Sequence, residues 1–158
     1  MGRPSWDDYF INMTDTIGER ATCDRGKSGA LIVRDKRILT TGYVGSPQGL
    51  PHCDEDGHLM HTVIDENGKE SKHCVRTLHA EENAILQAAQ FGPPLAGATL
   101  YCKMTPCFRC ATKIIRVGIV RVVAKKRYHA EEKTIKWFKE AKIQLDILDD
   151  EVETYENQ

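Results

Sequence analysis

The chain has 158 residues, which suits one compact domain with its own core and is hardly enough for two. Its shares of hydrophobic residues (41%) and charged residues (28%) exclude a disordered chain, a collagen-like repeat and a membrane protein. Because 22 basic residues face 23 acidic ones, the formal net charge of −1 gives no overall attraction to nucleic acid or anionic lipid.

Helical periodicity, β-rich runs and turn residues divide most of the chain into regular elements. Ser5, with Asp8 three residues later, forms a capping box ahead of an apolar helical face. The turn residues Asp35 and Lys36 join two β-rich runs into a hairpin. The patterns predict helices over residues 5–19, 80–91, 106–117 and 131–142, and strands over residues 29–34, 37–43, 98–102, 119–124 and 144–148.

Two segments lack this periodicity. Gly, Pro, Asp, His and Cys accumulate between residues 45 and 77, where the polar stretch 65–71, with its Asn67–Gly68 turn, is expected to form an exposed flap. The acidic segment 149–158 is expected to fray. A hairpin followed by alternating strands and helices predicts one layered α/β domain with a mixed sheet over residues 1–158.

Six cysteines and six histidines are unusual in a chain of otherwise ordinary composition. The first residues form no apolar leader, and no apolar run reaches the roughly 18 residues that a membrane span requires. We therefore expect a cytoplasmic protein. In that compartment thiols stay reduced, so the cysteines are better interpreted as metal ligands than as disulfides.

The strongest chemical signal consists of two motifs, each at the start of a predicted helix. One is the His-Ala-Glu motif of residues 79–81, and the other is the Cys-x-x-Cys motif of Cys107 and Cys110. Cysteines three residues apart lie on one face of the first helical turn, where the helix dipole favours the thiolate form. With His79 they supply three ligands for a tetrahedral zinc and leave one position open for water, as in catalytic zinc sites.

Glu81 lies two residues after His79 and need not be a ligand itself. Beside the metal it can move protons, a role for which a closed pocket raises the pKa of a carboxyl group. Alone, the Cys-x-x-Cys motif also fits half of a structural zinc site or a redox pair. Together and in this order, the two motifs match the pattern of zinc-dependent nucleobase deaminases.

The chain resembles the cytidine deaminase superfamily and, within it, the deoxycytidylate (dCMP) deaminases. Residues 79–85 look like the first zinc motif of that superfamily, and residues 105–111 look like the second. The loop 42–55 and the segment 73–78 are similar to bacterial and phage-type dCMP deaminases. The resemblance covers about residues 5–148 and implies a three-layer α/β/α domain with a mixed five-stranded sheet.

The resemblance implies zinc-dependent hydrolytic deamination of dCMP to dUMP with release of ammonia, a reaction that feeds dTMP synthesis. Glu81 would protonate N3 of the cytosine and assist the departing amine. The resemblance also assigns substrate contacts to Arg25, Lys27, Ala80, Asn83, Thr105 and Tyr128. Here Arg25 and Lys27 would face the phosphate, although they can also be ordinary surface cations, just as Tyr128 can be a core residue.

One position departs from the family. Val44 stands where the family usually has an asparagine that contacts the sugar hydroxyl. A valine can neither donate nor accept that hydrogen bond, and the loss costs on the order of 1–3 kcal/mol. Either another group holds the sugar or the substrate differs from dCMP.

Three further cysteines lie outside the predicted helices and strands. Phage-type members carry an additional structural zinc, and the resemblance assigns it in part to Cys23 and Cys53. We expect Cys74 as the third ligand and His73, His52 or His58 as the fourth. Such a site would attach the loop 45–77 to the rest of the domain. The alternative is three reduced, partly buried cysteines, while Cys102 on a predicted strand is expected in the core.

Other functions stay open on this evidence. A deaminase of the same fold could act on cytidine, dCTP, guanine or tRNA adenosine, and a non-catalytic zinc-stabilised binding module would need no Glu81. The near-neutral charge argues against nucleic acid, and no membrane association is expected. The family resemblance further implies a homo-oligomer, either a dimer or a hexamer, with dCTP and dTTP as effectors.

Overall fold

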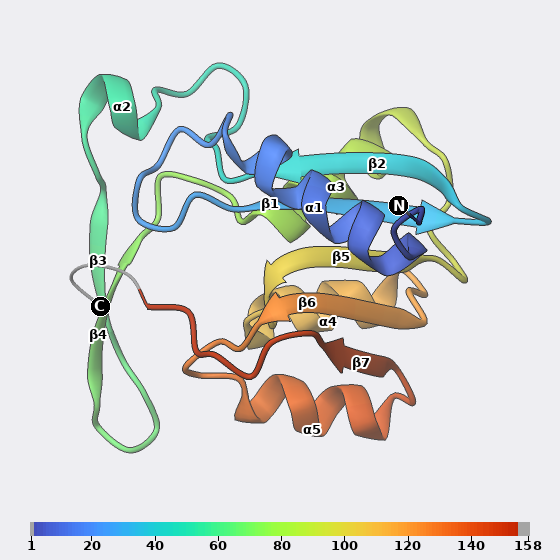
Figure 1. Ribbon diagram of the computed structural model, residues 1–158. Coiled ribbons are helices and arrows are strands. Elements are labelled where there is room, and N and C mark those ends of the chain that lie inside the picture. The colour runs from blue at the N-terminus through green and yellow to red at the C-terminus, as the bar shows by residue number, and fades with distance from the viewer. Residues whose placement is uncertain (1, 155–158) are drawn as a thin grey trace.

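A five-stranded mixed sheet forms the centre of the computed structural model, which describes residues 2–154. Its strands are β1 (Gly29–Arg34), β2 (Arg37–Tyr43), β5 (Thr99–Met104), β6 (Arg121–Lys126) and β7 (Gln144–Ile147). They lie in the order β2-β1-β5-β6-β7 (Figure 1). β1 pairs antiparallel with β2 and β5, whereas β5, β6 and β7 run parallel. The predicted mixed sheet is confirmed.

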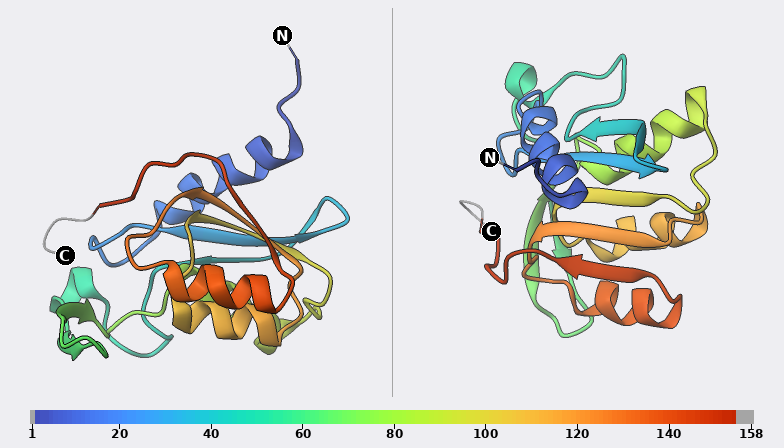
Figure 2. Two further views of the ribbon diagram at one scale, coloured as in Figure 1. Left: turned by 90° about the horizontal axis from the view of Figure 1, so that it is seen from below. Right: turned by 45° about the vertical axis from the view of Figure 1, so that its right-hand side comes forward.

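Helices cover both faces of this sheet and make three layers. They are α1 (Trp6–Gly18), α3 (Ala80–Phe91), α4 (Phe108–Arg116) and α5 (Glu132–Glu140). α1 covers one face, and α3, α4 and α5 cover the other (Figure 2). Successive strand residues face opposite layers, so Leu31 packs with Phe10 of α1 while Ile32 and Cys102 join the core under the other helices. No helix among the described residues is long and apolar enough to cross a lipid bilayer.

The helix ends follow the sequence signals. The Ser5 hydroxyl accepts a hydrogen bond from the backbone N–H of Asp8 at 3.1 Å, which caps α1 as predicted. His79 is the N-cap residue of α3, and Cys107 is the N-cap residue of α4. A Cβ atom at Gly42 would overlap the backbone at the start of α3, so only glycine lets β2 pass this close. The sheet thereby fixes the end of α3 that carries His79.

Residues 45–77 contain more regular structure than the sequence predicts. They form the short helix α2 (Cys53–Asp56) and a separate hairpin of β3 (Met60–Ile64) and β4 (Glu70–Cys74). The expected flap is the tip of this hairpin, where the side chain of Asp65 accepts hydrogen bonds from two backbone N–H groups of the turn. The hairpin stands beyond the carboxyl ends of β5 and β6 (Figure 1), which is where α/β sheets commonly bind ligands.

The acidic segment after β7 does not fray over residues 149–154. It returns beside the end of β6, and Arg127 exchanges two backbone hydrogen bonds with it, to Glu151 and from Glu153, each 2.9 Å long. Lys126 forms ion pairs with the side-chain carboxylates of Glu151 and Glu153. The basic end of β6 thus compensates the acidic charge that led us to expect fraying. Residues 155–158, also part of that expectation, lie outside the described residues.

Candidate active site

The two sequence motifs meet at the N-termini of α3 and α4. The Nδ1 atom of His79 lies 3.5 Å from the Sγ atom of Cys107 and 3.4 Å from that of Cys110. Zinc–ligand bonds of about 2.3 Å to sulfur and 2.0–2.1 Å to nitrogen, at the tetrahedral angle, place such atoms about 3.6 Å apart. The three residues therefore fit a zinc ion with no rearrangement of the backbone.

Hydrogen bonds within this set shift the pKa values of its members. The hydrogen bond to Cys107 raises the pKa of His79 to about 9. The hydrogen bond from Cys110 lowers the pKa of Cys107, and the same contact raises that of Cys110. Metal ligands must be deprotonated, so binding of Zn²⁺ here displaces the protons of His79 and Cys110.

Glu81 lies beside the three ligands and is not one of them. Its carboxylate oxygen Oε2 is 3.9 Å from the Sγ atom of Cys110, and its side chain is buried. Burial raises the pKa of Glu81 above its usual value. A carboxyl group with a raised pKa can hold a proton near neutral pH and return it, as proton transfer during catalysis requires.

A single pocket joins this centre to the hairpin. Its wall is formed by Cys23, Arg25, Gly26, Ser28, Val44, Ser71, Lys72, His73, Cys74, Thr77, His79, Ala80, Glu81, Met104, Thr105, Cys107, Tyr128 and His129. The inner end contains Glu81 and Thr105, which are buried, and the outer end contains exposed polar residues of β4. The Oγ1 atom of Thr105 has no hydrogen-bond partner among the described residues.

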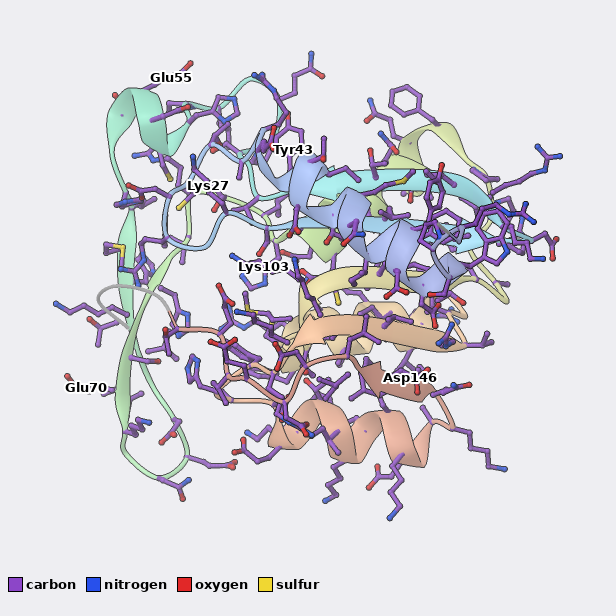
Figure 3. All side chains as sticks on the ribbon, in the orientation of Figure 1. Lys27, Tyr43, Glu55, Glu70, Lys103 and Asp146 are labelled. Carbon is purple, nitrogen blue, oxygen red and sulfur yellow. The ribbon has the colours of Figure 1, made fainter. Side chains whose placement is uncertain are left out.

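The expected substrate contacts divide into three groups. Arg25, Val44, Ala80, Thr105 and Tyr128 line the pocket. Asn83 lies behind the wall, where its amide donates hydrogen bonds to the carbonyl groups of Tyr43 (2.7 Å) and Gly45 (3.3 Å) and so holds the segment that contains Val44. Lys27 does not line the pocket, and its carbonyl group accepts a hydrogen bond from Lys103. Figure 3 labels both residues, Lys27 on the loop before β1 and Lys103 on β5.

A second group of residues that together could hold a metal ion lies next to the pocket. Cys23, Cys53, Cys74 and His58 place one ligand atom each within 4.8 Å of the others. The Sγ atoms of Cys53 and Cys74 are 3.5 Å apart, and the Sγ atom of Cys23 is 3.6 Å from the Nδ1 atom of His58. These distances suit four ligands around a tetrahedral zinc, which is the pattern of closed structural sites. Asp24 binds the other ring nitrogen of His58 at 2.9 Å and orients the ring.

The structure corrects the fourth ligand of this group. His73 does not join the three cysteines, because side chains alternate along β4 and its neighbour Cys74 is the one that reaches them. His52 is not part of the group either, since its Nδ1 atom is 3.0 Å from the hydroxyl of Thr22. His58 follows α2 directly and is brought to the cysteines by that short helix.

Thiol pKa values in this group differ. Burial raises the pKa of Cys53 to about 12. Burial also raises the pKa of Cys74, but backbone N–H groups of Arg76 and Leu59 outweigh it, so that pKa is lowered to about 7. Cys74 is therefore the thiol of this group that most readily forms a thiolate.

Comparison with known proteins identifies the family. The family model of the cytidine and deoxycytidylate deaminase zinc-binding region matches residues 4–126. The chain belongs to the cytidine and deoxycytidylate deaminase family. The ComE operon protein 2 of Bacillus subtilis is 45% identical over 132 residues, which cover 84% of this chain and 62% of that protein. The chain thus spans less than two thirds of the length of this relative.

Two phage proteins match along nearly their full length. The deoxycytidylate deaminase of Mycobacterium phage D29 is 36% identical over 126 residues, which cover 78% of this chain and 96% of that protein. The crystal structure of the dCMP deaminase from the cyanophage S-TIM5, in complex with dCMP and dUMP, has a TM-score of 0.73. That match covers 93% of this chain and 99% of the cyanophage chain at 23% identity, and it shows a shared fold.

Sequence reasoning missed several residues of the pocket in this family member. Ser28, Ser71, Lys72 and His129 line the wall without having been singled out. Ser71 ends the segment 65–71 that the sequence predicts as an exposed flap, because the polarity of that segment signals exposure and says nothing of a pocket beside it. The signal that could have found them is the alternation of side chains along a strand. The five residues of β4 lie in a polar segment and are too few to establish that alternation from the sequence.

Proposed function

We propose that this protein is a zinc-dependent hydrolase that deaminates dCMP to dUMP and releases ammonia. The observation that carries the proposal is the three-ligand set of His79, Cys107 and Cys110 with buried Glu81 beside it at the inner end of a pocket. Three protein ligands leave a fourth position for water, which a closed structural site does not. The names of the phage D29 relative and of the S-TIM5 structure support dCMP as the substrate.

Zinc held by these three residues would supply a water molecule activated for attack on C4 of the cytosine ring. Glu81 is the group that moves protons in this proposal: its carboxylate takes one proton from the attacking water and passes it to N3 of the base, then takes the remaining proton from the hydroxyl added at C4 and passes it to the departing amino group. Thr105 offers its buried hydroxyl to the polar edge of the base, because that hydroxyl has no other partner among the described residues. The ring of Tyr128, partly buried in the wall, excludes water beside the base.

The outer end of the pocket would receive the sugar and the phosphate. Arg25 lines this end and supplies a guanidinium group, which suits phosphate oxygens. Val44 presents an apolar surface, so the sugar would be held by other wall residues. Lys27 is not included in this proposal, because its position is outside the wall.

A second zinc bound by Cys23, Cys53, Cys74 and His58 is part of the proposal. The four residues come from the loop before β1, from α2, from the segment after it and from β4. One metal would therefore fasten the whole segment 45–77 to the domain, a segment with few apolar core residues of its own. Metal analysis with two zinc ions per chain supports this site, and one zinc per chain refutes it.

The proposal extends to the surroundings of the protein. The cytoplasm, where thiols stay reduced, suits the five metal-ligating cysteines, and residues 1–158 would form one deaminase domain. A dimer or hexamer and regulation by dCTP and dTTP follow from the family resemblance. Light scattering and activity with and without these nucleotides test both.

Replacement of Glu81 by Gln tests the function directly. Gln occupies the same space but cannot transfer the proton, so we expect roughly a 10²- to 10⁴-fold loss of turnover with both zinc ions retained. Wild-type rates on dCMP, CMP, deoxycytidine, dCTP and guanine establish the substrate. A wild-type protein that binds zinc and deaminates none of them is a binding module, and the proposal is then wrong.

A further inference from the structure

The four residues of the second group come unequally from two walls of the pocket. Cys23 and Cys74 both line the pocket, the first on the loop before β1 and the second at the end of β4. Cys53 begins α2, and His58 lies between α2 and β3. Three of the four therefore belong to the segment 53–74, and Cys23 belongs to the rest of the domain. A zinc ion held by this group fastens the one wall to the other.

The β3–β4 hairpin has little else to hold it in place. Most of its strand residues are exposed, and a two-stranded hairpin without a core is only marginally stable. Arg25 donates a hydrogen bond to the carbonyl oxygen of Lys72 at 3.2 Å, and Glu66 at the tip pairs with Lys133 of α5 at 3.3 Å. Single contacts of this kind between exposed groups contribute little net free energy. The position of the hairpin thus depends on the metal.

Two thiols of the group are placed to react with each other. The Sγ atoms of Cys53 and Cys74 are 3.5 Å apart and are not bonded. The S–S bond of a disulfide is about 2.05 Å long, so the two sulfur atoms need to approach by only about 1.5 Å. Cys74 is partly buried and reachable through the pocket, whereas Cys53 is only 8% exposed. An accessible thiolate beside a second, protected cysteine is the arrangement found in redox-sensing proteins.

We propose that hydrogen peroxide joins Cys53 and Cys74 in a disulfide, which releases the zinc of this group and detaches the β3–β4 hairpin from the loop before β1. As metal ligands, both sulfur atoms start as thiolates. The sulfur of Cys74 attacks one peroxide oxygen, the O–O bond breaks, and a sulfenic acid and a hydroxide ion form. The sulfur of Cys53 then attacks that of Cys74, the S–O bond breaks, and a second hydroxide leaves as the S–S bond forms. Two electrons pass from sulfur to the peroxide, and each hydroxide takes a proton from solvent to become water.

This disulfide does not replace the connection that the zinc makes. It joins two residues of the same segment and leaves only Cys23 and His58 as ligands, which is half of a structural zinc site. The hairpin is then free to leave the loop before β1, and the pocket loses the wall that β4 supplies. A thiol reductant reverses the reaction by exchange, and zinc can bind again. The inference rests on the second zinc of the proposed function.

The test treats the zinc-loaded wild-type protein with hydrogen peroxide in the presence of a chromophoric zinc chelator. Trypsin cleaves after Lys69 and Lys72, so Cys53 and Cys74 fall on separate peptides, and mass spectrometry without reduction shows which cysteines are joined. We expect a joined pair of these two peptides, release of one zinc per chain beyond that of the untreated protein, and faster amide hydrogen exchange over residues 60–74. Dithiothreitol followed by zinc should restore all three properties.

Two histidine variants show whether the reaction belongs to the metal group. His58→Ala lacks one ligand and keeps the three thiols, so it should form the same disulfide at least as fast as the wild type. His52→Ala is the matched control, because its ring nitrogen contacts the hydroxyl of Thr22 and is not part of the group, and it should react as the wild type does. A disulfide that forms in His58→Ala and never in the wild type shows that zinc protects the pair, and the inference is then wrong.

The other outcomes separate this inference from the proposed function. A disulfide that contains Cys23, or one between Cys107 and Cys110 without the expected pair, overturns the inference and leaves dCMP deamination untouched. A protein that forms the expected disulfide but does not deaminate dCMP before treatment overturns the proposed activity alone. A wild-type protein that holds one zinc per chain before treatment overturns the second zinc, and this inference with it.

Discussion

Replacement of Glu82 by Ala should loosen the metal centre without touching a ligand. The Oε2 atom of Glu82 accepts a hydrogen bond from the backbone N–H of His79 at 3.0 Å, and its other oxygen binds Lys113 of α4. Glu82 thus connects the two helices whose N-cap residues, His79 and Cys107, are metal ligands. Its side chain is only 17% exposed, so the lost hydrogen bond is not fully replaced by water.

The free energy lost in Glu82→Ala can be divided between the hydrogen bond to His79 and the ion pair with Lys113. Loss of the cap at His79 costs about 1–2 kcal/mol, whereas the ion pair contributes a few tenths, roughly, because Lys113 is 45% exposed. Supporting residues of this kind change metal affinity by roughly 10- to 100-fold. Glu82→Ala should therefore weaken zinc binding by about that factor, and Glu82→Gln, which keeps an oxygen for the N–H of His79, by less than about threefold.

Competition with a chromophoric zinc chelator measures this effect. Two zinc ions can be released in this assay. Release from His79, Cys107 and Cys110 is recognised because deaminase activity is lost at the same chelator concentration, whereas release from the group of Cys23, Cys53, Cys74 and His58 does not require that loss. Glu140→Ala, at the exposed end of α5, is the matched control and should release zinc as the wild type does. If Glu82→Ala binds zinc as tightly as Glu140→Ala, the cap does not position His79 and the reasoning is wrong.

Three further predictions follow from other contacts. Arg121 binds both carboxylate oxygens of Asp7 and one of Asp146, so Arg121→Ala should lower the free energy of unfolding by about 2 kcal/mol in urea titrations at pH 7. Hydrogen bonding to Arg121 lowers the pKa of Asp7 below 3.8. This stabilisation is therefore present above pH 3.8 and should disappear as the pH falls through the lower pKa of the folded state. A difference in free energy of unfolding between the wild type and Arg121→Ala that persists at about pH 2 would contradict this. His58→Ala should remove one zinc per chain and lower Tm, whereas His52→Ala should keep both zinc ions, as metal analysis and calorimetry can establish. Arg25→Ala should raise KM for dCMP and leave that for deoxycytidine unchanged, and equal changes for the two substrates would exclude a phosphate contact.

The main sheet and its helices could be predicted because their signals are local. Asp35 and Lys36, the two turn residues of the β1–β2 hairpin, have positive φ angles of 52° and 60°, as a tight two-residue turn requires. The strands β3 and β4 were not predicted, since one face of their hairpin lies against a pocket and gives no apolar alternation. Fraying of residues 149–154 was predicted from acidic charge alone, and the lysines that pair with them lie more than twenty residues away in the sequence.

The metal centre was predictable for a related reason. His79, Cys107 and Cys110 each stand at a helix start, and a helix start places a side chain in a defined direction. The fourth member of the second group was not predictable, because His52, His58 and His73 are all close in sequence to a cysteine of that group. Only the course of α2 and the alternation along β4 select His58.

Strand β4 also constrains how this protein can diverge. Adjacent residues on it have different roles: Cys74 contributes a ligand atom to the second group, which His73 does not join, whereas His73 and Ser71 line the pocket only. An insertion or deletion of one residue within the strand would reverse both assignments at once. Changes at the hairpin tip near Gly68 leave both unaltered. Lineages that acquire a new substrate are therefore expected to vary the hairpin tip in length and to conserve the spacing between Ser71 and Cys74.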